Sequence, residues 1–140
     1  MFPTIPANSA TTSFPENDEG IFGYGLHGGG HLSMTNLVSN AGVVSSDVGG
    51  VGTARQGPGA CEYGGDKGIF AYGKSGSLYN MSNLVSNTGV VSSDVAGVGT
   101  ARRYLGACSY GEDKGIFGYG RVGTSETAVT NLVSNAGVVA

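Results

Sequence analysis

The sequence predicts an all-β fold built from three similar β-sheet units, each with the size of one blade of a β-propeller. A Gly-Ile-Phe-x-Tyr-Gly motif begins at Gly20, Gly68 and Gly115, so it recurs after 48 and then 47 residues. A four-stranded propeller blade has about this length. The composition agrees with this, because the chain has 27 Gly and 12% charged residues, while its hydrophobic residues (39%) recur in register.

The aromatic motif of each unit is predicted to be a β-strand with two different faces. Side chains alternate across a strand, so Phe70 and Tyr72 are expected on one face, and Ile69 and Ala71 on the other. In the first and third copies a glycine replaces Ala71, which leaves one face nearly bare. Such a strand suits sheets that stack on each other. The preceding Asp66-Lys67-Gly68 suits a hairpin turn with its glycine at positive φ.

The remaining segments complete a four-stranded antiparallel meander. The third unit is expected to contain a small, flat strand, the aromatic strand, a strand from the Asn-Leu-Val-Ser-Asn block and a final strand. These are Ala107–Tyr110, Gly115–Tyr119, a strand around Thr130–Ser134 and the residues after Gly137. Asn-Ala-Gly and Asn-Thr-Gly sequences between the last two strands are typical of hairpin turns.

The chain therefore divides into an N-terminal arm and three blades. Three prolines exclude a helix from most of the first 19 residues, and Ser9–Phe14 is expected to be an edge strand. We predict the arm at residues 1–8. We name the three blades repeat 1 (9–52), repeat 2 (53–99) and repeat 3 (100–140).

Charge and hydropathy argue against two classes of partner. The net charge is −3, and the seven Lys and Arg are dispersed, so binding to nucleic-acid phosphates is not expected. No apolar run approaches the roughly 18 residues that a membrane-spanning helix needs. Met1-Phe2-Pro3 lacks the basic start and apolar core of a secretory signal. We expect synthesis in the cytoplasm without a signal peptide, followed by virion assembly and lysis or another route to an extracellular assembly.

Cys61 and Cys108 stand 47 residues apart, at equivalent places in successive repeats. Equivalent positions in neighbouring units favour two small, buried, free thiols, although a disulfide or a metal role stays open. The chain has no Cys-x-x-Cys pair and no cluster of Cys and His with zinc spacing.

The segment after each aromatic strand differs most between the repeats and is predicted to be a loop at one edge of each blade. Loops on a rigid scaffold commonly carry binding residues. His27 and His31 flank three glycines and could hold a metal, but a solvated loop is the simpler interpretation, and we expect no metal and no cofactor. Tyr79 could stack on a sugar ring. The ligand-binding candidates are His27, His31, Lys74, Tyr79 and Arg121.

Other recurring polar groups favour structural roles. Ser-Ser-Asp occurs at Ser45–Asp47 and Ser92–Asp94, but no His recurs near either, so a Ser-His-Asp arrangement cannot be built. The recurring Asp-Lys-Gly turns could bind calcium, although turn formation explains them. Arg55 and Arg102 are expected to form ion pairs with Asp47 and Asp94 between blades, or to bind a ligand carboxylate. We predict that the protein is not an enzyme.

The repeat resembles a kelch-like blade in the order Ala-Arg, Gly-Ala-Cys, Asp-Lys-Gly-Ile-Phe-Gly-Tyr-Gly, Asn-Leu-Val-Ser-Asn, Val-Val-Ser-Ser-Asp. Kelch repeats place an arginine before the first strand and an apolar strand ending in glycines second; Arg102 and Gly115–Gly120 match these features. A Tyr-Gly pair replaces the usual double glycine, and there is no Trp. Residues 18–140 are also similar to the tandem repeats of tail-fibre-like and other virion-associated phage proteins. This resemblance implies a propeller fold and a viral setting.

Three blades do not close a ring, because propellers usually have four to eight. Open blade faces are adhesive, so we expect self-association into a closed propeller: two copies give six blades, and three give nine. The dimer is favoured, and docking on another virion protein is the alternative. The predicted function is a structural or adhesion module for assembly or attachment to host surfaces, including glycans. The alternative is a carbohydrate-binding propeller with sites at the inter-strand loops.

Overall fold

The structure is a computed structural model that describes residues 18–140, and this part of the chain is all β with no helix. The all-β prediction is confirmed. The predicted arm at 1–8 and edge strand at Ser9–Phe14 lie outside the described residues. The strands are β1 (Gly20–His27), β2 (Gly30–Val38), β3 (Gly59–Tyr63), β4 (Lys67–Ser75), β5 (Ser77–Val85), β6 (Gly106–Tyr110), β7 (Lys114–Gly118), β8 (Arg121–Val122), β9 (Ser125–Glu126) and β10 (Thr130–Val133).

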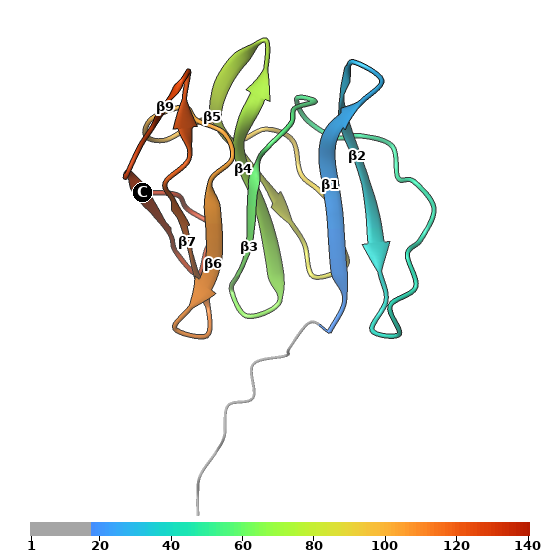
Figure 1. Cartoon of the computed structure of the whole chain (residues 1–140). Coiled ribbons are helices and arrows are strands. Elements are labelled where there is room, and N and C mark those ends of the chain that lie inside the picture. Colours follow the sequence, from blue (N-terminus) through green and yellow to red (C-terminus); the bar gives the residue numbers. More distant parts are fainter. Residues whose placement is uncertain (1–17) are drawn as a thin grey trace, which may run out of the picture.

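The strands form three main antiparallel sheets that follow one another along the chain (Figure 1). Repeat 1 contributes β1–β2, repeat 2 contributes β3–β4–β5 and repeat 3 contributes β6–β7–β10. The strands β8 and β9 form a small separate hairpin. The first three strands predicted for repeat 3 are confirmed as β6, β7 and β10, with ends shifted by one residue.

The predicted fourth strand is reduced to isolated bridges. Val139 pairs with Val133, and the same bridge joins Val91 to Val85 in repeat 2. A side chain then takes over from the backbone ladder, because the Leu84 amide donates to the hydroxyl of Ser92 at 3.1 Å. This contact takes the place of one backbone hydrogen bond between the bridge of Val85 with Val91 and the next bridge, of Ser82 with Val95. In repeat 3 Ala140 stands at the place of Ser92 and exchanges backbone hydrogen bonds with Leu132 at 2.9 and 3.0 Å.

The aromatic strand does not follow the predicted alternation. A β-bulge interrupts the pairing of β4 with β5 between Ala71 and Gly73, and Tyr72 adopts a positive φ of 66°. Phe70 therefore faces repeat 1, whereas Tyr72 lies on the opposite face with Ile69 and packs toward repeat 3. The prediction that Phe70 and Tyr72 share a face is wrong, because a bulge shifts the side-chain order by one residue.

The position of the turn glycines also differs from the prediction. The positive φ values before β4 belong to Gly64 and Gly65, whereas Gly68 lies inside the strand. The matching Gly115 has another reason to be glycine. A Cβ there would come within 3.0 Å of the Glu62 carbonyl oxygen on the neighbouring sheet. The glycine thus permits two sheets to approach closely.

The hydrophobic core lies between successive sheets. One cluster between repeats 1 and 2 is formed by Phe70, Val85 and Val91, with Ile21, Tyr24 and Val51 packed against it. The other, between repeats 2 and 3, is formed by Tyr63, Ile69, Ala71, Tyr72, Phe117 and Val133. Each junction has one edge-to-face aromatic pair: Tyr24 with Phe70 at 5.2 Å, and Tyr72 with Phe117 at 5.5 Å between ring centroids. The sheets are therefore held together face to face.

Candidate functional site

A fully buried arginine occupies each junction between repeats. Arg55 belongs to the linker that enters repeat 2, and its side chain is inaccessible to solvent. Its Nε donates to the Tyr72 carbonyl oxygen at 2.7 Å, and one terminal nitrogen donates to the Asn83 Oδ1 at 2.7 Å. The other terminal nitrogen donates to the Thr53 carbonyl oxygen at 3.0 Å. Three acceptors on repeat 2 thus replace the water that the guanidinium loses.

The other side of this guanidinium is covered by a tyrosine from the preceding repeat. The Arg55 Cζ lies 4.0 Å from the centroid of the Tyr24 ring, which is cation–π geometry. At the next junction Arg102 lies 4.0 Å from the Tyr72 centroid and donates through Nε to the Tyr119 carbonyl oxygen at 2.9 Å. At both junctions the guanidinium therefore lies between the tyrosine ring of the preceding repeat and the tyrosine carbonyl oxygen of the following repeat.

Asp94 supports the linker rather than the guanidinium directly. It accepts hydrogen bonds from the Thr53 amide and, at 2.7 Å, from the Thr53 hydroxyl, while the Asn83 amide donates to it at 2.9 Å. Burial opposes its ionisation, but these hydrogen bonds and nearby Arg55 lower the pKa of Asp94 below its usual value. Among residues 18–140 neither Arg55 nor Arg102 forms an ion pair with Asp47 or Asp94, so the predicted pairing between blades is wrong. In repeat 2 Asn83 instead bridges Arg55 and Asp94.

Sequence reasoning missed the asparagine and the tyrosine of this junction. Both signals are present in the sequence: Asn83 recurs as Asn36 and Asn131, and Tyr72 recurs as Tyr24 and Tyr119. The spacing could have grouped them with Arg55, but their roles depend on the bulge, which the sequence pattern does not reveal. All three recurring tyrosines have positive φ, between 62° and 66°.

The outward faces of repeats 1 and 3 expose the residues that the junctions bury. Phe22 is 67% exposed, whereas its equivalents Phe70 and Phe117 are 4% and 0% exposed. Tyr119 is 66% exposed, whereas its equivalent Tyr72 is fully buried. We define the open face of repeat 1 by Phe22, Val38 and Val44, and the open face of repeat 3 by Ile116, Tyr119 and Leu132. In the junctions, the equivalents of these residues form the two hydrophobic clusters.

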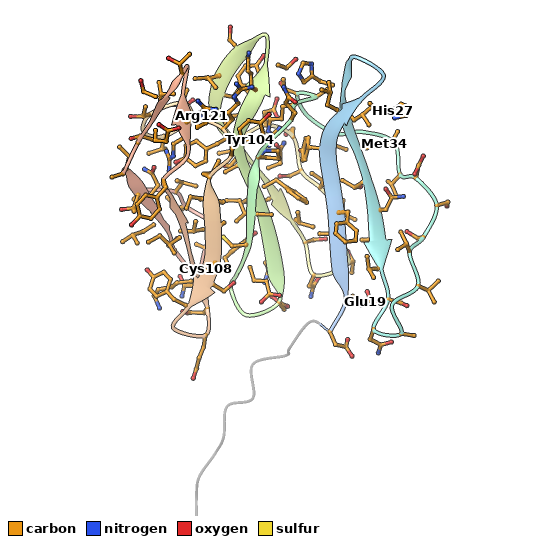
Figure 2. All side chains as sticks on the ribbon, viewed as in Figure 1. Glu19, His27, Met34, Tyr104, Cys108 and Arg121 are labelled. Atoms are coloured by element: carbon orange, nitrogen blue, oxygen red, sulfur yellow. The ribbon has the colours of Figure 1, made fainter. Side chains whose placement is uncertain are left out.

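The loop candidates lie together at one end of the strands but have different surroundings. Figure 2 places His27 and Arg121 at one end, and Glu19 and Cys108 at the opposite end. His27 is exposed at the end of β1, whereas His31 lies within β2 and has a buried Nε2 without a hydrogen-bond partner.

The other three candidates have contacts within their own sheets or linkers. Lys74 pairs through its backbone with Gln56. The hydroxyl of Tyr79 donates to the Ser75 carbonyl oxygen at 3.2 Å. Arg121 contacts Glu126, with Nε and Oε1 3.3 Å apart, and donates to the Thr124 carbonyl oxygen. The Tyr79 and Arg121 side chains are thus positioned within their own hairpins, whereas the Lys74 contact is a backbone bridge to the linker.

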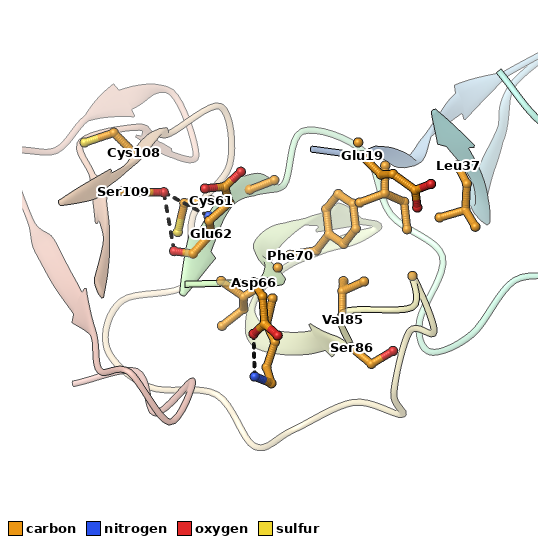
Figure 3. A pocket seen from close by; sticks show the side chains of 17 residues that line it. Glu19, Leu37, Cys61, Glu62, Asp66, Phe70, Val85, Ser86, Cys108 and Ser109 are labelled. Atoms are coloured by element: carbon orange, nitrogen blue, oxygen red, sulfur yellow. Dashed lines mark hydrogen bonds and ion pairs between the residues drawn. The ribbon is translucent and has the colours of Figure 1, made fainter. Parts of the chain in front are cut away.

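A pocket of about 420 Å³ lies at the opposite end of the strands, across all three repeats (Figure 3). Phe70 lies in the middle of this view, with Glu19 and Leu37 on one side and Cys61 and Ser109 on the other. None of the five loop candidates lines it.

Cys61 and Cys108, which both line the pocket, are free thiols, as predicted. The expected burial is wrong, since Cys61 is half-buried and Cys108 exposed. Burial raises the pKa of Cys61 to about 11.

Within residues 18–140 no group of three or more His, Cys, Asp or Glu side chains is arranged to hold a metal ion. The same part of the chain contains no helix capable of crossing a bilayer.

Comparison with known proteins gives a likeness of fold. No family model and no curated protein matches the sequence. The chain is similar to a solved structure described as a novel fungal alcohol oxidase with catalytic diversity among the AA5 family, in complex with copper. The TM-score is 0.54 at 16% identity, over 76% of this chain and 23% of that chain. The chain thus spans less than a quarter of that protein's length, and at this identity the likeness concerns the fold alone.

Proposed function

We propose that this protein is a non-enzymatic structural module that assembles through the open faces of repeats 1 and 3. The observation that carries the proposal is the contrast between equivalent aromatic residues. Phe70 and Phe117 are buried by a preceding repeat, while Phe22 presents the same side chain to solvent. The equivalent faces of repeats 2 and 3 are covered by the repeat before them. The apolar face of repeat 1 is therefore a docking surface.

The internal junctions suggest how two copies would meet. A Tyr from one repeat packs edge-to-face on the Phe of the next. Tyr119 of one copy would accordingly pack on Phe22 of another, with the open face of repeat 3 against the open face of repeat 1. Two such contacts related by a two-fold axis close a ring of six sheets, which is within the usual size of a propeller.

The resemblance to phage tandem repeats predicts where this assembly acts: in a virion or tail fibre, with attachment to host surfaces. The carbohydrate-binding alternative would place sites at the hairpin loops, but Tyr79, its sugar-stacking candidate, uses its hydroxyl within its own hairpin. A structural role therefore has the stronger support.

Light scattering on the purified chain tests the proposal. At micromolar concentrations we expect the wild-type protein to be a dimer, with twice the chain mass of 14.0 kDa. The variants Phe22→Asp and Tyr119→Asp should be monomers. The charged side chain would have to be buried without a partner in the contact. The matched control is Val43→Asp, because Val43 is exposed but its equivalent Val90 stays exposed at a filled junction. A monomeric wild-type chain at every concentration would contradict the proposal.

A further inference from the structure

Repeat 1 carries the receiving half of an arginine site that repeat 2 shows in its occupied form. Asn36 is the equivalent of Asn83, and Asp47 is the equivalent of Asp94. The Asn36 amide donates to Asp47 at 2.8 Å and to the Ser45 carbonyl oxygen at 3.1 Å. Asn83 makes the same two contacts in repeat 2, at 2.9 and 3.0 Å. The polar groups that receive Arg55 and Thr53 in repeat 2 are therefore already in position on repeat 1.

The occupied site defines the chemistry of the group that fits. The arginine Nε and one terminal nitrogen meet a backbone carbonyl and an asparagine oxygen, while the threonine two residues earlier donates to the aspartate. Gly52 precedes this threonine at a φ of 73°, and a Cβ there would overlap Asp94 and Asn83. The segment that fits is consequently Gly-Thr-x-Arg.

The backbone after the arginine adds a third contact. Gln56 and Lys74 exchange two hydrogen bonds, both at 2.9 Å, in a short antiparallel bridge. Arg103 and Arg121 form the same bridge in repeat 3. The equivalent residue in repeat 1 is Leu26, which pairs with β2 on one side and has no bridge on its other side among residues 18–140. An entering segment can therefore extend the sheet at Leu26.

This chain has no spare arginine segment to supply. The sequence contains no Lys or Arg before Arg55, so its first 54 residues cannot provide the cation. Its two Thr-Ala-Arg segments end in Arg55 and Arg102, both fully buried at internal junctions. Among residues 18–140, no hydrogen bond joins an arginine to Asn36 or Asp47. Neither Thr-Ala-Arg segment of this sequence is therefore available to the site on repeat 1.

We propose that the face of repeat 1 formed by Asn36, Asp47, the Tyr24 carbonyl and Leu26 binds a Gly-Thr-x-Arg segment of a partner polypeptide. The guanidinium is received by the Asn36 Oδ1 and the Tyr24 carbonyl, the threonine by Asp47, and the following backbone by Leu26. This inference rests on the proposed function, because it adds a second contact to the junction that a further copy would form at the open face of repeat 1. A second copy of this chain would cover Phe22 without bringing such a segment.

The probe for this site is a synthetic peptide with the sequence of residues 50–60, GVGTARQGPGA. It is titrated into the full chain carrying Tyr119→Asp, so that self-association does not cover the face, and two-dimensional NMR follows each amide. We expect saturable shifts at the Asn36 side-chain amide and at Leu26. The peptide with Lys in place of Arg should bind about tenfold more weakly, since an ammonium cannot reproduce the forked guanidinium contacts.

Substitutions in the chain locate the site. Asp47→Ala should weaken binding about tenfold, whereas Ser46→Ala, an exposed neighbour, should leave it unchanged. Equal binding of the Arg and Lys peptides, shifts confined to other residues, or no binding at millimolar peptide would overturn the inference. If the wild-type chain is a dimer and the peptide does not bind, the arginine site is refuted and the proposed function is retained. A monomeric chain that binds the peptide would refute self-assembly and retain the arginine site.

Discussion

At the scale of single residues, each junction depends on a buried arginine that has no carboxylate partner in direct contact. Arg55 is surrounded by neutral oxygens and an aromatic ring, and burial lowers the pKa of its guanidinium. An arginine remains charged under such conditions, so every one of these contacts offsets part of the cost of removing the charge from water. The loss of any one leaves a buried group unsatisfied.

Arg55→Lys tests this directly. The ammonium cannot reach both the Tyr72 carbonyl and the Asn83 oxygen in the same geometry, so one acceptor loses its partner. We expect a loss of about 2–3 kcal/mol in the free energy of unfolding, measured by urea denaturation. Arg121→Lys, in the half-exposed hairpin, is the control and should change stability by less than about 0.5 kcal/mol. Equal effects of the two changes would contradict the role assigned to Arg55.

Acid should weaken the junction through Asp94. Its pKa is lowered in the folded chain, so its contribution to stability is present above the ordinary aspartate pKa of 3.8. That contribution is lost as the pH falls through the lower, folded-state pKa. Asp94→Asn should therefore be less stable than wild type at pH 6, and the difference should shrink below pH 3.8. A difference in unfolding free energy that is independent of pH would contradict the assignment.

Residue roles were only partly predictable from the sequence. The recurring arginine and aspartate could be recognised as structural, and the recurrence of Asn83 could be seen as well, but not its place between them. The tyrosine was assigned to the wrong face, because strand alternation assumes unbroken pairing and the bulge after Ala71 breaks it. Nothing in the local sequence favours a positive φ for tyrosine, yet the exposed Tyr119 adopts it as the buried Tyr72 does, so this conformation does not depend on packing against a following repeat.

At the scale of elements, the aromatic strand connects two junctions because its bulge sends Phe and Tyr to opposite faces. The first three strands predicted for repeat 3 were correct to within one residue, since the repeat gave three copies of each pattern. The loops predicted at residues 26–33 and 74–80 were wrong, because strands continue through both segments and leave only short turns between them. The fourth strand was not well predicted, because in repeats 1 and 2 the serine after the Val-Val pair accepts a hydrogen bond from a backbone amide and interrupts the ladder. Side-chain competition of this kind does not appear in a hydrophobic pattern.

Equivalent phenylalanines provide a matched test at this scale. Phe70→Ala removes a ring that is buried against Tyr24 and should cost about 3–5 kcal/mol in unfolding free energy. Phe22→Ala changes the same position in repeat 1, where the ring is exposed, and should cost less than about 0.5 kcal/mol in the isolated chain. Thermal and urea unfolding under dilute conditions measure both. Similar losses for the two variants would contradict the described difference in burial.

At the scale of the whole molecule, three sheets stack in chain order and leave one unused face at each end. The two end faces are not alike: repeat 1 offers Phe22 with the acceptors for an arginine, and repeat 3 offers the Tyr119 ring. This polarity favours head-to-tail contacts over contacts between identical faces. The repeat architecture could be predicted from the spacing alone, whereas the polarity could not, because it arises from the positive φ of the tyrosine in each repeat.

The most direct test of the account is cross-linking between the two end faces. Phe22→Cys and Tyr119→Cys are combined in a chain whose own cysteines are replaced by alanine, and a short bis-maleimide is added. The account predicts covalent dimers for the double variant, with mass spectrometry linking position 22 of one copy to position 119 of another. Each single variant should stay largely monomeric. Links between two copies of position 22, or no links in the double variant, would contradict head-to-tail assembly through the open faces.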